Sequence, residues 1–199
     1  MDTGIAATTA RSARPCKRGR WQLRRILFCT AVVCASLTAY GQRASASAYQ
    51  IEAVYLYDFS KFVAWPARAG ANNEPFSICV LGEDPFGAVL DATLSGESIQ
   101  GSNLVAKRIS KPENAAGCKI VFVSNSEETR LKEILTAFDG ANILTVSDIP
   151  NFSQRGGMIQ FVLEGDKVRF EVNVKNAENA GLTLSSDLLE VALAVRRES

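Results

Sequence analysis

The sequence predicts an α/β fold: a Rossmann-like three-layer sandwich with a mostly parallel sheet plus a C-terminal antiparallel hairpin. Between residues 76 and 146, short apolar runs rich in β-branched residues alternate with helical patterns, as they do when parallel strands are joined by right-handed crossovers. Between residues 158 and 174 the apolar residues alternate strictly around Gly165-Asp166, which indicates a hairpin with a two-residue turn. The 153 residues that follow residue 46 are enough to bury one core, so we expect one domain.

The first predicted element is a helix over residues 47–63, in which apolar residues recur at helical spacing until Trp65-Pro66 ends it. Its aromatic residues cover more of the helix surface than a single apolar face. Two interpretations stay open, namely a helix covered on two sides by the monomer and a helix that offers an interaction or dimer surface. The strands of the parallel sheet follow at 76–81, 103–109, 118–124 and 142–146.

Helical patterns separate these strands. Asp84 as cap and Pro85 as first residue predict a helix that runs to about Leu94. A short helical turn is expected over 111–117, and a longer helix over 125–138, with Asn125 as its cap and Gly140 at its end. The last predicted element is an amphipathic helix over 187–196.

The amino-terminal segment carries an unbalanced charge. Residues 1–46 hold eight basic residues and one acidic residue, a net charge of +7, whereas the rest holds fourteen basic and twenty acidic residues, a net charge of −6. The basic run leads into fifteen uncharged residues, 26–40, and then into small residues, the order of a secretory signal peptide. We therefore predict a signal peptide over 1–46, removed after Ala46 or alternatively after Ala48, and one domain over 47–199. A helix of fifteen residues spans only about 22 Å, so a permanent membrane anchor is the weaker alternative.

Cleavage would leave two of the five cysteines, Cys79 and Cys118. In an oxidising compartment two cysteines most simply form a disulfide. The alternative is a pair of buried free thiols. Neither cysteine lies in a C-x-x-C motif, which argues against a thioredoxin-like role.

Several classes of function are excluded by missing residues. The chain has no histidine, so it has no Ser-His-Asp triad, no Cys-His dyad and no imidazole-ligated metal. It also lacks the glycine-rich nucleotide motifs, the S-x-x-K motif and three clustered metal ligands. The charge of −6 argues against nucleic-acid binding. We therefore expect a protein that is not an enzyme and has no cofactor.

Polar residues after predicted strand ends are the remaining candidates for a small-molecule site. Glu83-Asp84, Glu127-Glu128 and Asp148 all follow strands, on the side where open α/β sheets bind ligands. Helix capping accounts for the first four equally well. Gly156-Gly157 could form an anion nest, but a hairpin entry that needs positive φ explains both glycines better.

Five strings of the sequence resemble the YfiR family of periplasmic proteins from Gram-negative bacteria. They cover about residues 48–195 and read AYQIEAVYLYDFSKFVAWP, FSICVLGEDPFGAVLD, GCKIVFVS, ILTVSDIPNFSQRGGMIQFVLEGDKVRFEVNV and AGLTLSSDLLEVA. The resemblance implies a non-enzymatic regulator. Founding members bind the periplasmic sensor domain of an inner-membrane diguanylate cyclase and repress it, and an outer-membrane lipoprotein relieves the repression by sequestering the repressor.

The resemblance also implies roles for individual residues. The stabilising disulfide of the family falls on Cys79 and Cys118, and the partner-binding pocket on the hairpin falls on Ile159 and Phe161 as apolar members and Glu171 as the polar one. Some members have a second cysteine pair where this chain has Ser153 and Gln160, so redox control through that pair is not expected here.

Together these observations predict a periplasmic, homodimeric regulatory protein that represses the sensor domain of a membrane signalling protein, a diguanylate cyclase or a kinase, and so controls cyclic-di-GMP. Such repression requires the regulator to bind one state of the partner better than the other. The alternative is a periplasmic small-molecule-binding sensor domain that uses the crevice at the strand ends.

Overall fold

The computed structural model describes residues 47–66 and 74–197. The chain divides into two units, Met1–Arg43 and Ala44–Ser199, and all described residues lie in the second. The predicted signal peptide lies outside the described residues and stays a prediction. Within the described ranges, we find no helix with the length and apolar character needed to cross a membrane.

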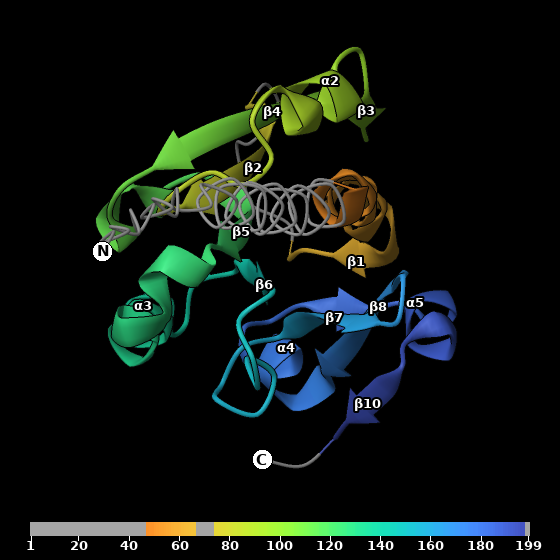
Figure 1. The fold of residues 1–199 in the computed structure, drawn as a ribbon. Helices are drawn as coiled ribbons and strands as arrows, with labels where there is room; N and C mark the ends of the chain where they lie inside the picture. Colours follow the sequence, from red (N-terminus) through yellow and green to blue (C-terminus); the bar gives the residue numbers. More distant parts are fainter. Residues whose placement is uncertain (1–46, 67–73, 198–199) are drawn as a thin grey trace, which may run out of the picture. The chain divides into compact units, whose positions relative to one another are not determined.

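A mixed sheet of eight strands forms the centre of the second unit (Figure 1), in the order β10-β8-β7-β6-β5-β2-β4-β3. Five of its strand pairs are parallel, whereas β7 with β8 and β3 with β4 are antiparallel. The strands are β2 (Phe76–Leu81), β3 (Ser98–Ile99), β4 (Ser102–Ile109), β5 (Cys118–Val123), β6 (Leu144–Ser147), β7 (Ile159–Glu164), β8 (Lys167–Asn173) and β10 (Ala194–Arg196). The predicted mostly parallel sheet with a C-terminal hairpin is thereby confirmed.

Helices cover both faces of this sheet, because successive strand residues point to opposite sides. Ile78 and Val80 of β2 pack in one core with the opening helix and α2, while Cys79 and Leu81 pack in a second core with α3. This arrangement confirms the three-layer sandwich. The helices are the opening helix (residues 47–62), α2 (Ala88–Leu94), α3 (Leu131–Ala137), α4 (Val174–Asn179) and α5 (Ser186–Val191), with 3-10 turns η1 (Pro112–Ala115) and η2 (Asn125–Arg130).

Two of the predicted helix starts are wrong. Asp84 accepts a hydrogen bond from the backbone N–H of Phe86 at 2.8 Å, but α2 begins only at Ala88, after Gly87 has turned the chain at a φ of +53°. The helix expected to begin at Asn125 starts instead as the 3-10 turn η2, which Ser124 caps, and becomes an α-helix at Leu131. In both places the chain makes a tighter local turn before the regular helix begins.

The carboxy-terminal part differs most from the sequence prediction. The helix expected over 187–196 ends at Val191, and Ala194–Arg196 form β10, which pairs in parallel with β8. Helix α4 was not predicted, nor was the small antiparallel sheet of β1 (Val63–Ala64) and β9 (Thr183–Leu184). The helical pattern of the last residues is overridden because the free edge of β8 offers backbone hydrogen bonds to a strand.

Candidate functional site

The hairpin that carries the predicted partner site has a regular antiparallel register. Ile159 pairs with Val172, Gln160 with Glu171, and Phe161 with Phe170. Since side chains alternate across a strand, Ile159 and Phe161 face one side of the sheet and Glu171 faces the other. The structure therefore brings the two apolar residues together but separates them from the carboxylate.

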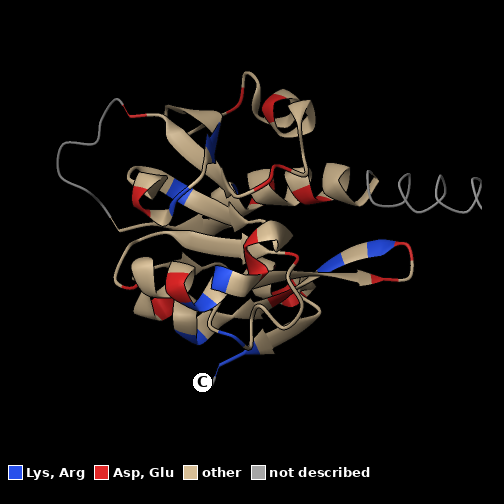
Figure 2. Cartoon of the chain, turned by 60° about the vertical axis from the view of Figure 1, so that its left-hand side comes forward, with Lys and Arg blue, Asp and Glu red and all other residues tan. Residues whose placement is uncertain are grey.

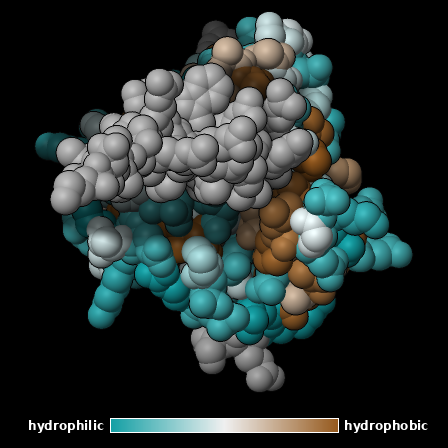
Figure 3. Space-filling model, viewed as in Figure 1, coloured by the Kyte–Doolittle hydropathy of each residue, from teal (hydrophilic) through white to brown (hydrophobic). Residues whose placement is uncertain are grey.

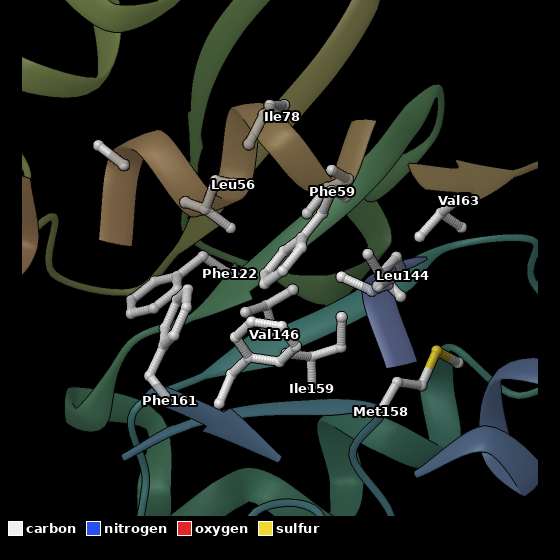
Figure 4. Packing of buried hydrophobic residues seen from close by; sticks show 14 of the residues in the cluster. Leu56, Phe59, Val63, Ile78, Phe122, Leu144, Val146, Met158, Ile159 and Phe161 are labelled. Carbon is white, nitrogen blue, oxygen red and sulfur yellow. The ribbon is translucent and has the colours of Figure 1, made fainter. Parts of the chain in front are cut away.

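Ile159 and Phe161 lie beneath the opening helix, with 0% and 3% of their surface exposed. The ring of Phe161 lies 5.9 Å from that of Phe59 and 6.0 Å from that of Tyr55, both of which belong to the opening helix. Figure 4 shows Phe59 pointing from the helix toward Ile159 and Phe161. These side chains hold the opening helix on the hairpin, and a partner can touch them only if that helix moves.

Glu171 belongs to a polar network on the other side of the hairpin. Its Oε2 accepts a hydrogen bond from Ser153 Oγ at 2.9 Å and lies 3.7 Å from a guanidinium nitrogen of Arg196. Gln160 Oε1 accepts a hydrogen bond from the backbone N–H of Ser153 at 3.1 Å, and Asn173 donates to the Ser153 carbonyl at 2.9 Å. The network ties the segment before β7 to β7, β8 and β10, and hydrogen bonds join Ser153 to Gln160.

The accessible part of the hairpin lies near its turn. Leu163 shares a face with Phe161 but is 61% exposed. Ile51 and Val54 of the opening helix are exposed apolar residues as well. Figure 3 shows hydrophobic side chains gathered on the side of the molecule where the opening helix and the hairpin lie. An apolar surface of this kind is suited to contact with another protein.

The turn of the hairpin adds charge beside this apolar surface. Gly165 adopts a φ of +61°, and the predicted two-residue turn at Gly165-Asp166 is confirmed. Figure 2 shows both signs of charge on the hairpin near its turn, where the sequence places Glu164, Asp166, Lys167 and Arg169. Mixed charge around an apolar centre is the usual anatomy of a protein-binding surface.

The two cysteines form the predicted disulfide. Cys79 lies in β2 and Cys118 at the start of β5, the adjacent strand, with their Cα atoms 5.9 Å apart. Both side chains are buried in the core beneath α3. The bond therefore joins two central strands and offers no accessible sulfur for catalysis.

The carboxylates at the strand ends do not form one acid/base pair. Asp84 binds the guanidinium of Arg108 at 2.8 Å, and Glu128 binds that of Arg155 at 3.1 Å. Asp148 instead contacts the opening helix through Tyr49. Among the described residues, no group of three or more His, Cys, Asp or Glu side chains could hold a metal ion.

A cavity of about 430 Å³ lies at the amino ends of the parallel strands, opposite the carboxyl ends that carry the carboxylates described above. Its lining includes Trp65, Phe76, Glu74, Ser102 and Lys119, and the last four lie at or near the amino ends of β2, β4 and β5. The crevice predicted for a small molecule was at the carboxyl ends of the strands, so this cavity is a different place.

Gly157 is required for a packing reason that the sequence pattern does not reveal. Gly156 has a φ of +109°, as expected, but Gly157 is needed for space, because a Cβ there would lie 2.1 Å from atoms of the buried Phe152 ring. Arg155, the basic residue beside the proposed anion nest, is paired with Glu128.

Comparison with known proteins identifies similarity to one family. The YfiR/HmsC-like family matches residues 49–193. A conserved domain protein from Vibrio cholerae O1 biovar eltor is 13% identical, with a TM-score of 0.47 over 60% of this chain and 54% of that one. An ABC domain in complex with L-Trp from Streptococcus pneumonia is 10% identical, with a TM-score of 0.47 over 60% of this chain and 55% of that one. The chain thus spans about half the length of these two solved structures.

Proposed function

The chain belongs to the YfiR/HmsC-like family, and from this premise we propose that it is a periplasmic regulator that binds and represses the sensor domain of a membrane signalling protein. The partner that the family implies is a diguanylate cyclase, so the protein would lower cyclic-di-GMP. We further propose that the protein is a homodimer and that an outer-membrane lipoprotein relieves the repression by sequestering it. The role is regulatory rather than catalytic. The family match over residues 49–193 is the observation that carries the proposal.

The hairpin is the proposed partner-binding element. Leu163 supplies an exposed apolar side chain on the hairpin, and the opening helix, which packs on the hairpin through Tyr55 and Phe59, has exposed apolar side chains at Ile51 and Val54. Burying one such side chain against a partner contributes roughly 1.5–3 kcal/mol. The charged residues near the turn would then set the orientation of the partner.

The predicted site residues take two different parts in this proposal. Ile159 and Phe161 are buried, so they support the surface from beneath and keep the hairpin rigid. Glu171 is 19% exposed and hydrogen-bonded to Ser153, so its carboxylate is held in one position. Rigid placement of such groups reduces the entropy lost on binding.

The test measures cellular cyclic-di-GMP in a strain that lacks the gene. Deletion should raise cyclic-di-GMP, and the wild-type gene should lower it again. Leu163→Asp should fail to restore repression, because a carboxylate would have to be desolvated in the interface. Val191→Asp, at a side chain of α5 that is 58% exposed, is the matched control and should restore repression fully.

Binding should be measured in parallel with the purified periplasmic sensor domains of the host's membrane diguanylate cyclases. One of them should bind the wild type, and Leu163→Asp should weaken its affinity at least about tenfold, which corresponds to about 1.4 kcal/mol. If deletion leaves cyclic-di-GMP unchanged and none of the sensor domains binds, the proposed function is wrong. If Val191→Asp and Leu163→Asp are equally defective, the surface lies elsewhere.

A second candidate function is a small-molecule sensor, which the cavity of about 430 Å³ favours because ligand pockets commonly measure about 300–1,000 Å³. Trp65 lines this cavity and donates a hydrogen bond from its indole N–H to the Lys119 carbonyl at 3.2 Å. A ligand in the cavity should change the fluorescence of Trp65. A panel of periplasmic metabolites that changes neither this fluorescence nor the melting temperature would argue against this candidate.

A further inference from the structure

The first turns of the opening helix meet the segment after β6 through polar side chains. The hydroxyl of Tyr49 donates a hydrogen bond to Oδ2 of Asp148 at 2.8 Å, and its ring packs edge-on against Phe86 at 5.6 Å. Glu52 follows Tyr49 by three residues, on the same side of the helix, and only 5% of its surface is exposed. Two carboxyl groups, from Glu52 and Asp148, are therefore placed between the helix and the sheet.

These carboxyl groups have oxygens that no other group satisfies. Glu52 Oε2 and Asp148 Oδ1 are both buried, and neither has a hydrogen-bond partner. A buried carboxylate without a partner is strongly disfavoured, and a second negative charge nearby disfavours it further. The contact cannot therefore persist with both groups ionised and nothing to compensate them.

The groups around the pair supply no positive charge in the described part of the chain. Tyr49 faces the pair from the opening helix, and the segment before α2 presents the apolar ring of Phe86. Arg108, which lies next to that segment, is bound by Asp84 at 2.8 Å and by Asp91 at 2.6 Å. Among the described residues, Asp148 is the charged group that acts on Glu52.

The compensating species is a proton rather than a larger cation. An ammonium group or a metal ion needs space and several ligands. Glu52 and Asp148 are two carboxyl groups, and the described residues contain no group of three or more Asp, Glu, Cys or His side chains that could hold a metal ion. A proton on a carboxyl oxygen needs no such space.

We propose that Glu52 is protonated while the opening helix is docked on the sheet, and that loss of this proton loosens the first turns of the helix. The device is a pH-sensitive latch made of Glu52, Asp148 and Tyr49. It goes beyond the proposed function and does not depend on it. Because Tyr55 in these turns packs against Phe161 and Phe170, loosening them would uncover part of the apolar face of the hairpin.

The pKa values agree with this geometry. Burial, and secondly the charge of Asp148, raise the pKa of Glu52 from 4.5 to about 8. Burial also raises the pKa of Asp148, although the hydrogen bond from Tyr49 opposes that shift. Since the docked state holds a proton that the undocked state releases near pH 4.5, docking is strongest below that pH and weakens as the pH rises to about 8.

The test is amide hydrogen exchange on the protein purified from the periplasm after expression of the full chain, read as protection factors so that the intrinsic pH dependence of exchange is removed. Between pH 6 and 9, protection of residues 49–56 should fall by roughly a hundredfold relative to α3, since each pKa unit between the docked and undocked states is tenfold. Glu52→Gln keeps the shape of the protonated acid and should remove this pH dependence. Glu190→Gln, at an exposed glutamate of α5, is the matched control and should keep it.

Two more measurements make the outcome decisive if Glu52→Gln folds poorly. Asp148→Asn removes the second negative charge and should protect residues 49–56 at pH 9 better than the wild type does. Carbon-13 NMR of labelled glutamate should show Glu52 titrating well above pH 6, and at a lower pH in Asp148→Asn. A Glu52 that titrates near pH 4.5, or residues 49–56 whose protection follows that of α3 at every pH, would overturn the proposal.

Discussion

Breaking the disulfide should lower stability by an amount that follows from its position in the chain. Cys79 and Cys118 are 39 residues apart in the sequence. In the chain-entropy model, closing a loop of this length removes about 13 cal/mol/K of entropy from the unfolded chain, which is about 4 kcal/mol at 25 °C. Because both cysteines lie in adjacent central strands, reduction should leave the fold in place but make unfolding easier.

Urea unfolding of protein from the periplasm, followed by far-UV circular dichroism, measures this change. The free energy of unfolding of the wild type should fall by up to about 4 kcal/mol in the presence of a reductant. The variant with Cys79→Ala and Cys118→Ala should unfold at low urea with and without reductant, since it has no bond to reduce. Its stability should lie slightly below that of the reduced wild type, because the lost sulfur atoms leave small cavities in a buried core.

The disulfide does not stabilise the fold if the wild type unfolds at the same urea concentration with and without reductant, provided that thiol titration shows that the reductant has opened the bond. Titration of the denatured, unreduced protein should find no free thiol. Two free thiols would mean that the disulfide does not form in the purified protein.

Two further predictions concern the core and the loop before the hairpin. Phe59→Ala should destabilise the protein by about 3–5 kcal/mol, because Phe59 is fully buried against Phe161 and Phe170. Urea unfolding measures this loss, and a loss below about 1 kcal/mol would mean that packing of the opening helix through Phe59 contributes little to stability. Gly157→Ala should lower the melting temperature by several degrees, since its Cβ would meet the Phe152 ring at 2.1 Å; an unchanged melting temperature in differential scanning calorimetry would contradict this packing.

Local patterns were sufficient to predict the central elements. The strand over Phe76–Leu81 and the hairpin around Gly165-Asp166 have the predicted positions. In both cases the signal is contained within a few neighbouring residues: a continuous apolar run for a buried strand, and alternation with a glycine turn for a hairpin. The disulfide was also predictable, because the predicted cleavage leaves two of the five cysteines and two cysteines permit a single intramolecular pairing.

Elements that depend on distant partners were not predictable in the same way. Residues 194–196 have a helical pattern in the sequence, but they form β10 because β8 has an open edge next to them. Likewise, Ile159 and Phe161 were expected in a partner pocket, and the structure places them beneath Phe59 of the opening helix. Their place in partner binding stays a prediction, since burial by the chain itself does not test it.

Residue types and the spacing of near neighbours were enough to predict the central strands, the helical segments between them, the cysteine pair and the exclusion of histidine chemistry. The surface that the hairpin leaves exposed, and the burial of Glu52 beside Asp148, depend on how the opening helix packs on the sheet. Residues 96 positions apart meet there, and the cost of placing two carboxyl groups together exists only after the helix has packed on the sheet.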